Sequence, residues 1–107
     1  MDIDCSKQTG HRIMINNKFI NIRDILYIKC EDHVSAVYLK DGKTEYITQT
    51  LTVFENKLRD YGFIRIHRNT LINEFYVIKI DKKKQFIYIA EKIMLKVARR
   101  MLKLFKN

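Results

Sequence analysis

Residues 63–73 read Phe-Ile-Arg-Ile-His-Arg-Asn-Thr-Leu-Ile-Asn, and this stretch decides the fold. It begins with the period of a β-strand, which places Arg65 and His67 on one face. Asn69 comes next, and an asparagine side chain can fix a turn by bonding to nearby backbone. The stretch therefore predicts a strand that ends in a polar turn. We expect His67 to be packed and hydrogen-bonded beside that turn, and Asn73 to stabilise the loop that follows.

A helix is expected directly before this stretch. Apolar side chains at spacings of three and four form one stripe near residues 50–61. Such a stripe is typical of core packing, and Gly62 lies where a glycine commonly ends a helix. Thr52 and Glu55 have capping-box spacing, and Thr48 or Thr50 could equally be the cap.

The rest of the chain has the period of short strands. Turn signals separate the strands at residues 16–18, 40–43 and 82–84, where Asn-Asn-Lys, Lys-Asp-Gly-Lys and Lys-Lys-Lys occur. We expect about eight to ten short strands, and hence one mainly-β domain. The stretch 97–105 can close as a short C-terminal helix, because its apolar and basic residues separate onto different faces. The other expected strands are 12–15, 19–22, 25–30, 35–39, 44–47, 76–80, 85–89 and 93–95.

The length and composition limit the class of protein. A chain of 107 residues is the size of one domain, and its 47% hydrophobic residues suffice for a core. We therefore expect an N-terminal tail at residues 1–10, a single domain at 11–107, and no two-domain enzyme. No apolar run is long enough for a membrane span or a signal peptide. With only two cysteines, this predicts a cytoplasmic protein without membrane contact.

The net charge of +9 is confined to the end of the chain. Residues 1–62 hold nine Lys and Arg against nine Asp and Glu, whereas residues 63–107 hold twelve against three. A field this one-sided attracts a polyanion, and nucleic acid is the leading candidate. The alternative is a solvated surface that keeps a small protein soluble.

The sequence contains none of the common catalytic or metal-binding motifs considered below. Its three histidines and two cysteines have no short metal-ligand spacing, and it contains neither a Gly-x-Ser-x-Gly motif nor a phosphate-binding glycine loop. We therefore expect no catalysis, no metal, no cofactor and no small-molecule substrate.

The order of motifs along the chain resembles a known family. An Ile-Leu-Tyr-Ile strand at 25–28 precedes a strand that leads into Asp41-Gly42, then the helix, then the 63–73 block, and finally Lys-Val-Ala-Arg-Arg at 96–100. From about Arg12 to Phe105 this pattern is similar to the LytTR-type DNA-binding domain of bacterial response regulators. The chain departs from many members at Asn69 and Ala98, where they have serine.

The resemblance implies a fold of small antiparallel β-sheets with few helices. It also implies a sequence-specific, double-stranded DNA-binding domain of a bacterial transcriptional regulator, which inserts loops and a C-terminal arginine segment into the major groove. The implied partners are repeated DNA half-sites bound by two copies, a receiver domain and a cognate histidine kinase pathway. The alternative function is a less specific module that binds RNA or anionic surfaces.

The resemblance also implies three DNA-contacting places. They correspond to His33, to Arg68 with Asn69, and to Arg99 with support from Arg100. An arginine fork matches guanine O6 and N7, although phosphate contacts are commoner than base contacts. Asn69 could instead fix its own turn, and His33 could pair with an adjacent carboxylate.

Two lysines complete the candidate interface. Lys83 lies at the tip of a basic hairpin turn, and Lys96 precedes the arginine segment. Such residues are usually solvated, but they can add phosphate attraction that does not depend on base sequence.

Overall fold

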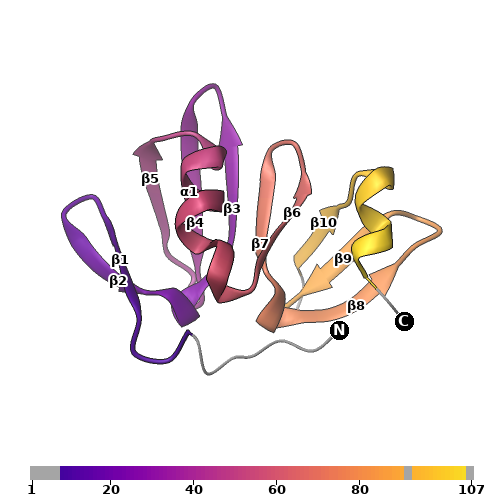
Figure 1. The fold of residues 1–107 in the computed structure, drawn as a ribbon, viewed down its shortest axis with the longest axis horizontal. Coiled ribbons are helices and arrows are strands. Elements are labelled where there is room, and N and C mark those ends of the chain that lie inside the picture. The colour runs from indigo at the N-terminus through magenta and orange to yellow at the C-terminus, as the bar shows by residue number, and fades with distance from the viewer. Residues whose placement is uncertain (1–7, 91–92, 106–107) are drawn as a thin grey trace.

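The computed structural model describes residues 8–90 and 93–105, and these residues form three antiparallel sheets and one α-helix (Figure 1). The predicted mainly-β fold is confirmed. The elements are β1 (Arg12–Ile15), β2 (Lys18–Asn21), β3 (Ile25–Glu31), β4 (Val34–Leu39), β5 (Thr44–Thr48), α1 (Leu51–Leu58), β6 (Phe63–His67), β7 (Thr70–Asn73), β8 (Val77–Asp81), β9 (Phe86–Ile89) and β10 (Ile93–Lys96).

The central sheet has five strands in the order β5-β4-β3-β7-β6. Strands β3, β4 and β5 form a meander, and the β6–β7 hairpin joins it when β7 pairs with β3. A hairpin of β1 and β2 lies at one end of the molecule, and a sheet of β8, β9 and β10 lies at the other (Figure 1).

Strand β7 was not predicted, although it lies inside the deciding stretch. All four of its residues are buried, so the run has no alternation of apolar and polar side chains to mark it as a strand. Leu71 points into a core that it shares with α1 and the β1–β2 hairpin, whereas Ile72 points into a second core with β9 and β10. The central sheet therefore separates two hydrophobic cores.

The predicted helix is shorter than its apolar stripe. Helix α1 ends at Leu58, and one turn of 3₁₀ helix carries the chain to Gly62, whose φ of 81° needs a left-handed backbone. Thr50 is the N-cap residue by its backbone. The capping-box interpretation of Thr52 and Glu55 is wrong, because both side chains contact Arg65 on β6 instead.

The stretch after β10 closes as expected in a short helix, which is a 3₁₀ helix at Arg99–Leu104. Phe105 is buried directly after it, and Met101 and Leu102 pack against the second core. The C-terminal 3₁₀ helix is thus held by its apolar face while its basic residues remain on the surface.

Asn73 stabilises the end of the central sheet that lies opposite the β6–β7 turn. It is fully buried, its amide donates to the Ile25 carbonyl over 2.9 Å, and its Oδ1 accepts from Phe75 N over 3.1 Å. Gln8 also donates to Asn73 Oδ1 and is only 1% exposed. Residues 1–7 of the expected tail lie outside the described residues, but Gln8 packs against the domain.

The described residues contain no helix with the length and apolarity that a bilayer crossing requires.

Candidate nucleic-acid interface

Two of the three expected contact turns leave the central sheet at the same end. Lys29 on β3 is in register with Thr70 on β7, and Cys30 N donates to the Asn69 carbonyl over 2.9 Å. The β3–β4 turn, which contains His33, and the β6–β7 turn, Arg68-Asn69, therefore project in the same direction. Both lie along the upper edge of the molecule in Figure 1.

The C-terminal arginines lie next to the β6–β7 turn. Ala98 N donates to the Ile66 carbonyl over 2.7 Å, so the chain runs beside β6 immediately before Arg99. Arg100 and Arg68 line one shared groove of about 350 Å³. The structure thus brings Arg68 and Arg100 together from two distant parts of the chain, and Arg99 directly precedes Arg100.

The β6–β7 turn is held by a side chain that sequence reasoning did not assign to the site. The Arg65 guanidinium donates to the Arg68 carbonyl, to Glu55 Oε1 over 3.1 Å and to Thr52 Oγ1 over 3.4 Å. Arg65 thereby joins the turn to α1, and much of its hydrogen-bonding capacity is used inside the protein. The only sequence signal of this contact is the Thr52–Glu55 spacing, which suggested a helix cap.

Asn69 and His67 stabilise the same turn. Asn69 Oδ1 accepts from Thr70 Oγ1 over 2.9 Å and lies 2.8 Å from His67 Nδ1. Both contacts involve the amide oxygen, which bidentate reading of adenine needs as an acceptor. The geometry favours the turn-fixing role for Asn69 over a base contact.

His33 lies at the tip of the β3–β4 turn. Asp32 and His33 have φ angles of 48° and 68°, which is the left-handed geometry of a two-residue hairpin turn. The ion pairs of residues 8–90 and 93–105 are Lys18–Glu45 and Arg65–Glu55, so the alternative in which His33 pairs with an adjacent carboxylate is not formed there. The imidazole is exposed.

The two candidate lysines lie beyond the arginines. Lys83 is exposed in the β8–β9 turn, where Lys84 N donates to Asp81 Oδ1 over 3.0 Å. Lys96 is in register with Phe86 next to this turn, and Val97 N donates to the Gln85 carbonyl over 2.8 Å. The lysines therefore flank the arginine groove on one side, and His33 lies on the other.

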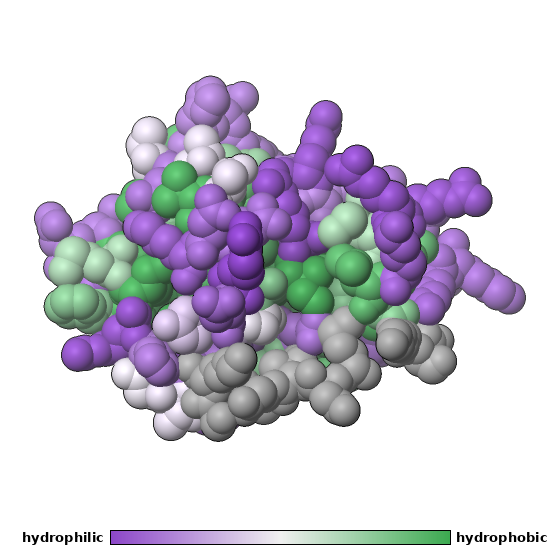
Figure 2. Space-filling view, in the orientation of Figure 1, coloured by the Kyte–Doolittle hydropathy of each residue, from purple (hydrophilic) through white to green (hydrophobic). Residues whose placement is uncertain are grey.

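Five basic candidate side chains of this edge take part in no ion pair of the described residues. Arg68, Arg99, Arg100, Lys83 and Lys96 are all exposed, and neither ion pair of the described residues includes them. Figure 2 shows hydrophilic side chains projecting from the upper right of the molecule, where Figure 1 places the β6–β7 turn, the C-terminal 3₁₀ helix and the β8–β9 turn. This edge can attract an extended polyanion.

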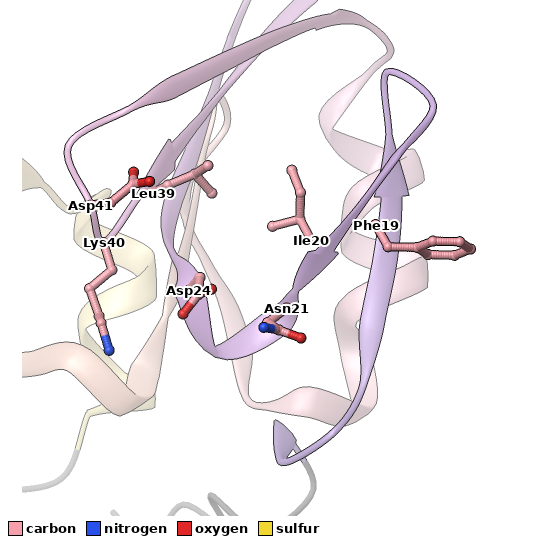
Figure 3. Close-up of a pocket in the computed structure, with 7 residues that line it drawn as sticks. All are labelled: Phe19, Ile20, Asn21, Asp24, Leu39, Lys40 and Asp41. Atoms are coloured by element: carbon pink, nitrogen blue, oxygen red, sulfur yellow. The ribbon is translucent and has the colours of Figure 1, made fainter.

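A pocket of about 290 Å³ lies near the β1–β2 hairpin, away from this edge. Asp24, Lys40 and Asp41 give it mixed charge, and the ring of Phe19 points away from the other labelled side chains (Figure 3).

Residues 8–90 and 93–105 contain no cluster of three His, Cys, Asp or Glu side chains that could hold a metal ion.

Comparison with known proteins gives consistent matches. Residues 16–107 match the family described as the LytTr DNA-binding domain. The chain is 37% identical over 63 residues to the sensory transduction protein LytT of Bacillus subtilis, across 58% of this chain and 25% of that protein. It is 28% identical over 93 residues to the sensory transduction protein LytR of Staphylococcus saprophyticus, across 82% of this chain and 35% of that protein.

The fold also matches a solved structure. A LytTr DNA-binding domain from Bacillus cereus superposes with a TM-score of 0.69, over 88% of this chain and 90% of that one, at 18% sequence identity. The two chains therefore have the same fold. This chain spans only 25% and 35% of the length of the two curated relatives.

Proposed function

Because the chain belongs to the LytTr DNA-binding domain family, we propose that it is a sequence-specific binder of double-stranded DNA in a bacterial transcriptional regulator. The observation that carries this proposal is the position of three turns and segments, distant in sequence, along one basic edge. A rigid sheet holds them, so their spacing is set before DNA arrives, and little ordering cost remains to be met on binding.

The arginines are the groups that read bases. Arg68 and Arg99 each present a fork of donors that fits guanine O6 and N7 in the major groove, and Arg100 supports them. Asn69 keeps the turn in shape through its bonds to His67 and Thr70. His33 contacts a base edge or a phosphate at the other end of the interface.

The lysines supply affinity that does not depend on sequence. Lys83 and Lys96 bind phosphates that flank the segment read by the arginines. Each neutralised phosphate releases counterions, so these contacts weaken steeply as salt rises.

So small a domain covers a limited stretch of DNA. A single module of this kind buries roughly 600–1,000 Å² of protein surface, which favours the use of two copies on repeated half-sites. The curated relatives are named sensory transduction proteins and are longer than this chain. This supports a receiver domain and a cognate histidine kinase as further partners in the pathway.

The test is a selection of duplexes from a random pool at two salt concentrations, followed by titration of Arg99→Ala. The loss of a base-reading arginine costs about 1–3 kcal/mol on the selected duplex and relaxes base choice at one position. On a random duplex the same variant loses much less affinity. The measurement is fluorescence anisotropy of labelled duplexes.

Arg59→Ala is the matched control. It removes the same charge, but Arg59 follows α1 at the opposite end of β6 from the Arg68 turn, where it donates to Asn56 Oδ1 over 2.7 Å. Its affinity for the selected duplex stays close to that of the unchanged protein. A pool that yields no preferred sequence at either salt concentration would overturn the proposal in favour of a less specific binder of nucleic acid or anionic surfaces.

A further inference from the structure

The sheet of β8, β9 and β10 has one buried face and one open face. Ile87, Ile89 and Leu95 point into the second core and are nearly or fully buried. Side chains alternate along a strand, so Tyr88, between Ile87 and Ile89, and Met94, next to Leu95, point outward. The open face consists of Ile78, Lys79, Asp81, Phe86, Tyr88, Met94 and Lys96, and is called the outer β8–β10 face below.

A bulge in β8 places an extra apolar residue on this face. The register with β9 shifts between Val77 and Lys79, which leaves Ile78 without a partner on the facing strand. Ile78 is 67% exposed, and Lys79 beside it is exposed as well. Bulges of this kind re-aim a side chain, and here the isoleucine is directed away from the core.

The apolar residues lie close together across the strands. Lys79, Tyr88 and Met94 form one cross-strand row, and Met94 is 51% exposed. Phe86 and Lys96 pair in the row nearer the β8–β9 turn. Each of these two rows therefore combines one lysine with apolar or aromatic side chains.

Lysines outnumber acids in the described residues of this sheet and its turns, which contain Lys79, Lys82, Lys83, Lys84 and Lys96. Asp81 is the one acid in residues 77–90 and 93–96, and its carboxylate accepts from Lys84 N in its own turn. The Lys79 ammonium lies over the Tyr88 ring, with Nζ 5.8 Å from the ring centroid. An occupant that complements this face must bring both carboxylates and apolar side chains.

We propose that the outer β8–β10 face is a docking surface for an acidic protein segment that carries large apolar side chains. Its apolar groups pack on Ile78, Tyr88 and Met94, and its carboxylates pair with Lys79 and Lys96. Contiguous exposed apolar residues with a charged rim are typical of protein interaction sites.

Two other occupants fit this face less well. Bases of a single strand need open aromatic rings, but the Tyr88 ring is partly covered by Lys79, and the most exposed residues are aliphatic. A second copy of this chain would bring its own lysines against Lys79 and Lys96, and like charges oppose that contact.

The test uses a synthetic peptide that contains Glu and Leu, with Glu/Ser and Lys/Leu peptides of the same length as references. Binding is followed by NMR of methionine and isoleucine methyl groups on the whole chain. We expect the Glu/Leu peptide to shift the Ile78 and Met94 signals and to leave Met14, which is 52% exposed on β1, unchanged.

Variants then separate the apolar part of this surface from the DNA edge, which shares Lys96 with it. The double variant Ile78→Ser with Met94→Ser lowers affinity for the Glu/Leu peptide about tenfold or more, whereas Met14→Ser has no effect. Both variants keep the DNA affinity of the unchanged protein, because none of these side chains belongs to the basic edge. All three residues are exposed, so circular dichroism is expected to show an intact fold.

Three results would overturn the proposal. Equal binding of the Glu/Ser peptide would reduce the attraction to charge alone. Shifts of the Ile78 and Met94 methyl groups by single-stranded oligothymidylate, but not by the Glu/Leu peptide, would make the face a nucleic-acid site. Self-association in sedimentation velocity that the double variant abolishes would make it a contact between copies.

Discussion

At Arg65 one guanidinium connects α1 to the turn that carries Arg68. A basic residue of the charged part of the chain is thus bonded within the protein. The hydrogen bond to the Arg68 carbonyl keeps the turn in one conformation, which lowers the cost of ordering it on binding.

We expect Arg65→Ala to lower affinity for the selected duplex about tenfold, the size of one lost hydrogen bond to a charged group. The turn then samples other conformations, so the loss is larger on the selected duplex than on a random one. Anisotropy titration of both duplexes measures the difference, with Arg59→Ala again as the charge control. Equal losses on both duplexes would instead indicate a phosphate contact.

Glu74 is a buried carboxyl that makes the stability of the fold depend on pH. It is 8% exposed, and burial raises the pKa of its carboxyl because the charged form is poorly solvated. Since the folded state holds this proton more tightly than the unfolded state, the contribution to stability is present at low pH and is lost as pH rises through the raised pKa.

Glu74→Gln replaces the buried ionisable carboxyl by an amide that stays neutral at every pH of the experiment. We expect the variant to have a higher free energy of unfolding than the unchanged protein at pH 7, and this gain to vanish below about pH 4, where an unfolded glutamate is also neutral. Urea unfolding at a series of pH values gives both curves. A gain that is the same at every pH would show that ionisation of Glu74 is not its cause.

At the scale of elements, β7 determines how the domain is held together. Leu71 and Ile72 are adjacent and fully buried, yet they belong to different cores. One short strand therefore links the part that contains α1 to the part that contains β8–β10.

Truncation at either position is expected to destabilise the whole domain. Leu71→Ala and Ile72→Ala each cost about 2–5 kcal/mol, the usual range for a buried aliphatic side chain. We expect circular dichroism and tyrosine fluorescence to report one coincident urea transition in both variants, because β7 couples the two cores. Two separate transitions would contradict this coupling. Leu104→Ala is the control: it lies at an exposed site and should change the free energy of unfolding by less than about 0.5 kcal/mol.

At the scale of the whole molecule, the distribution of charge favours attraction of DNA to one edge. The net charge of +9 derives from residues 63–107, and the fold gathers much of it along the edge formed by the β6–β7 turn, the C-terminal 3₁₀ helix and the β8–β9 turn. Long-range attraction of this kind speeds encounter with DNA but does not select a sequence.

Lys83→Ala should therefore weaken binding by the same factor on selected and random duplexes. The slope of log affinity against log salt is expected to become shallower by about 0.9, the value for one lost phosphate contact. Lys57→Ala, at an exposed site on α1, is the matched control and should leave the slope nearly unchanged. A loss confined to the selected duplex would mean that Lys83 contacts a base.

The sequence by itself determined the local elements, because their signals lie within a few residues of each other. Asn16 and Asn17 adopt positive φ in the β1–β2 turn, and Gly62 ends the helical segment with a left-handed backbone, as their residue types predict. The family resemblance also identified Arg68 and Arg99 as candidates, since both stand in short recognisable motifs.

Only the tertiary structure decided which of these pieces meet. Strand β7 lacks alternation because neighbours bury it on both sides, and those neighbours come from remote parts of the chain. Arg65 and Glu55 find each other across a turn, and Ile78 is turned outward by a bulge in the pairing of β8 with β9. Such features depend on contacts between distant residues, which short-range spacing along a single sequence does not encode.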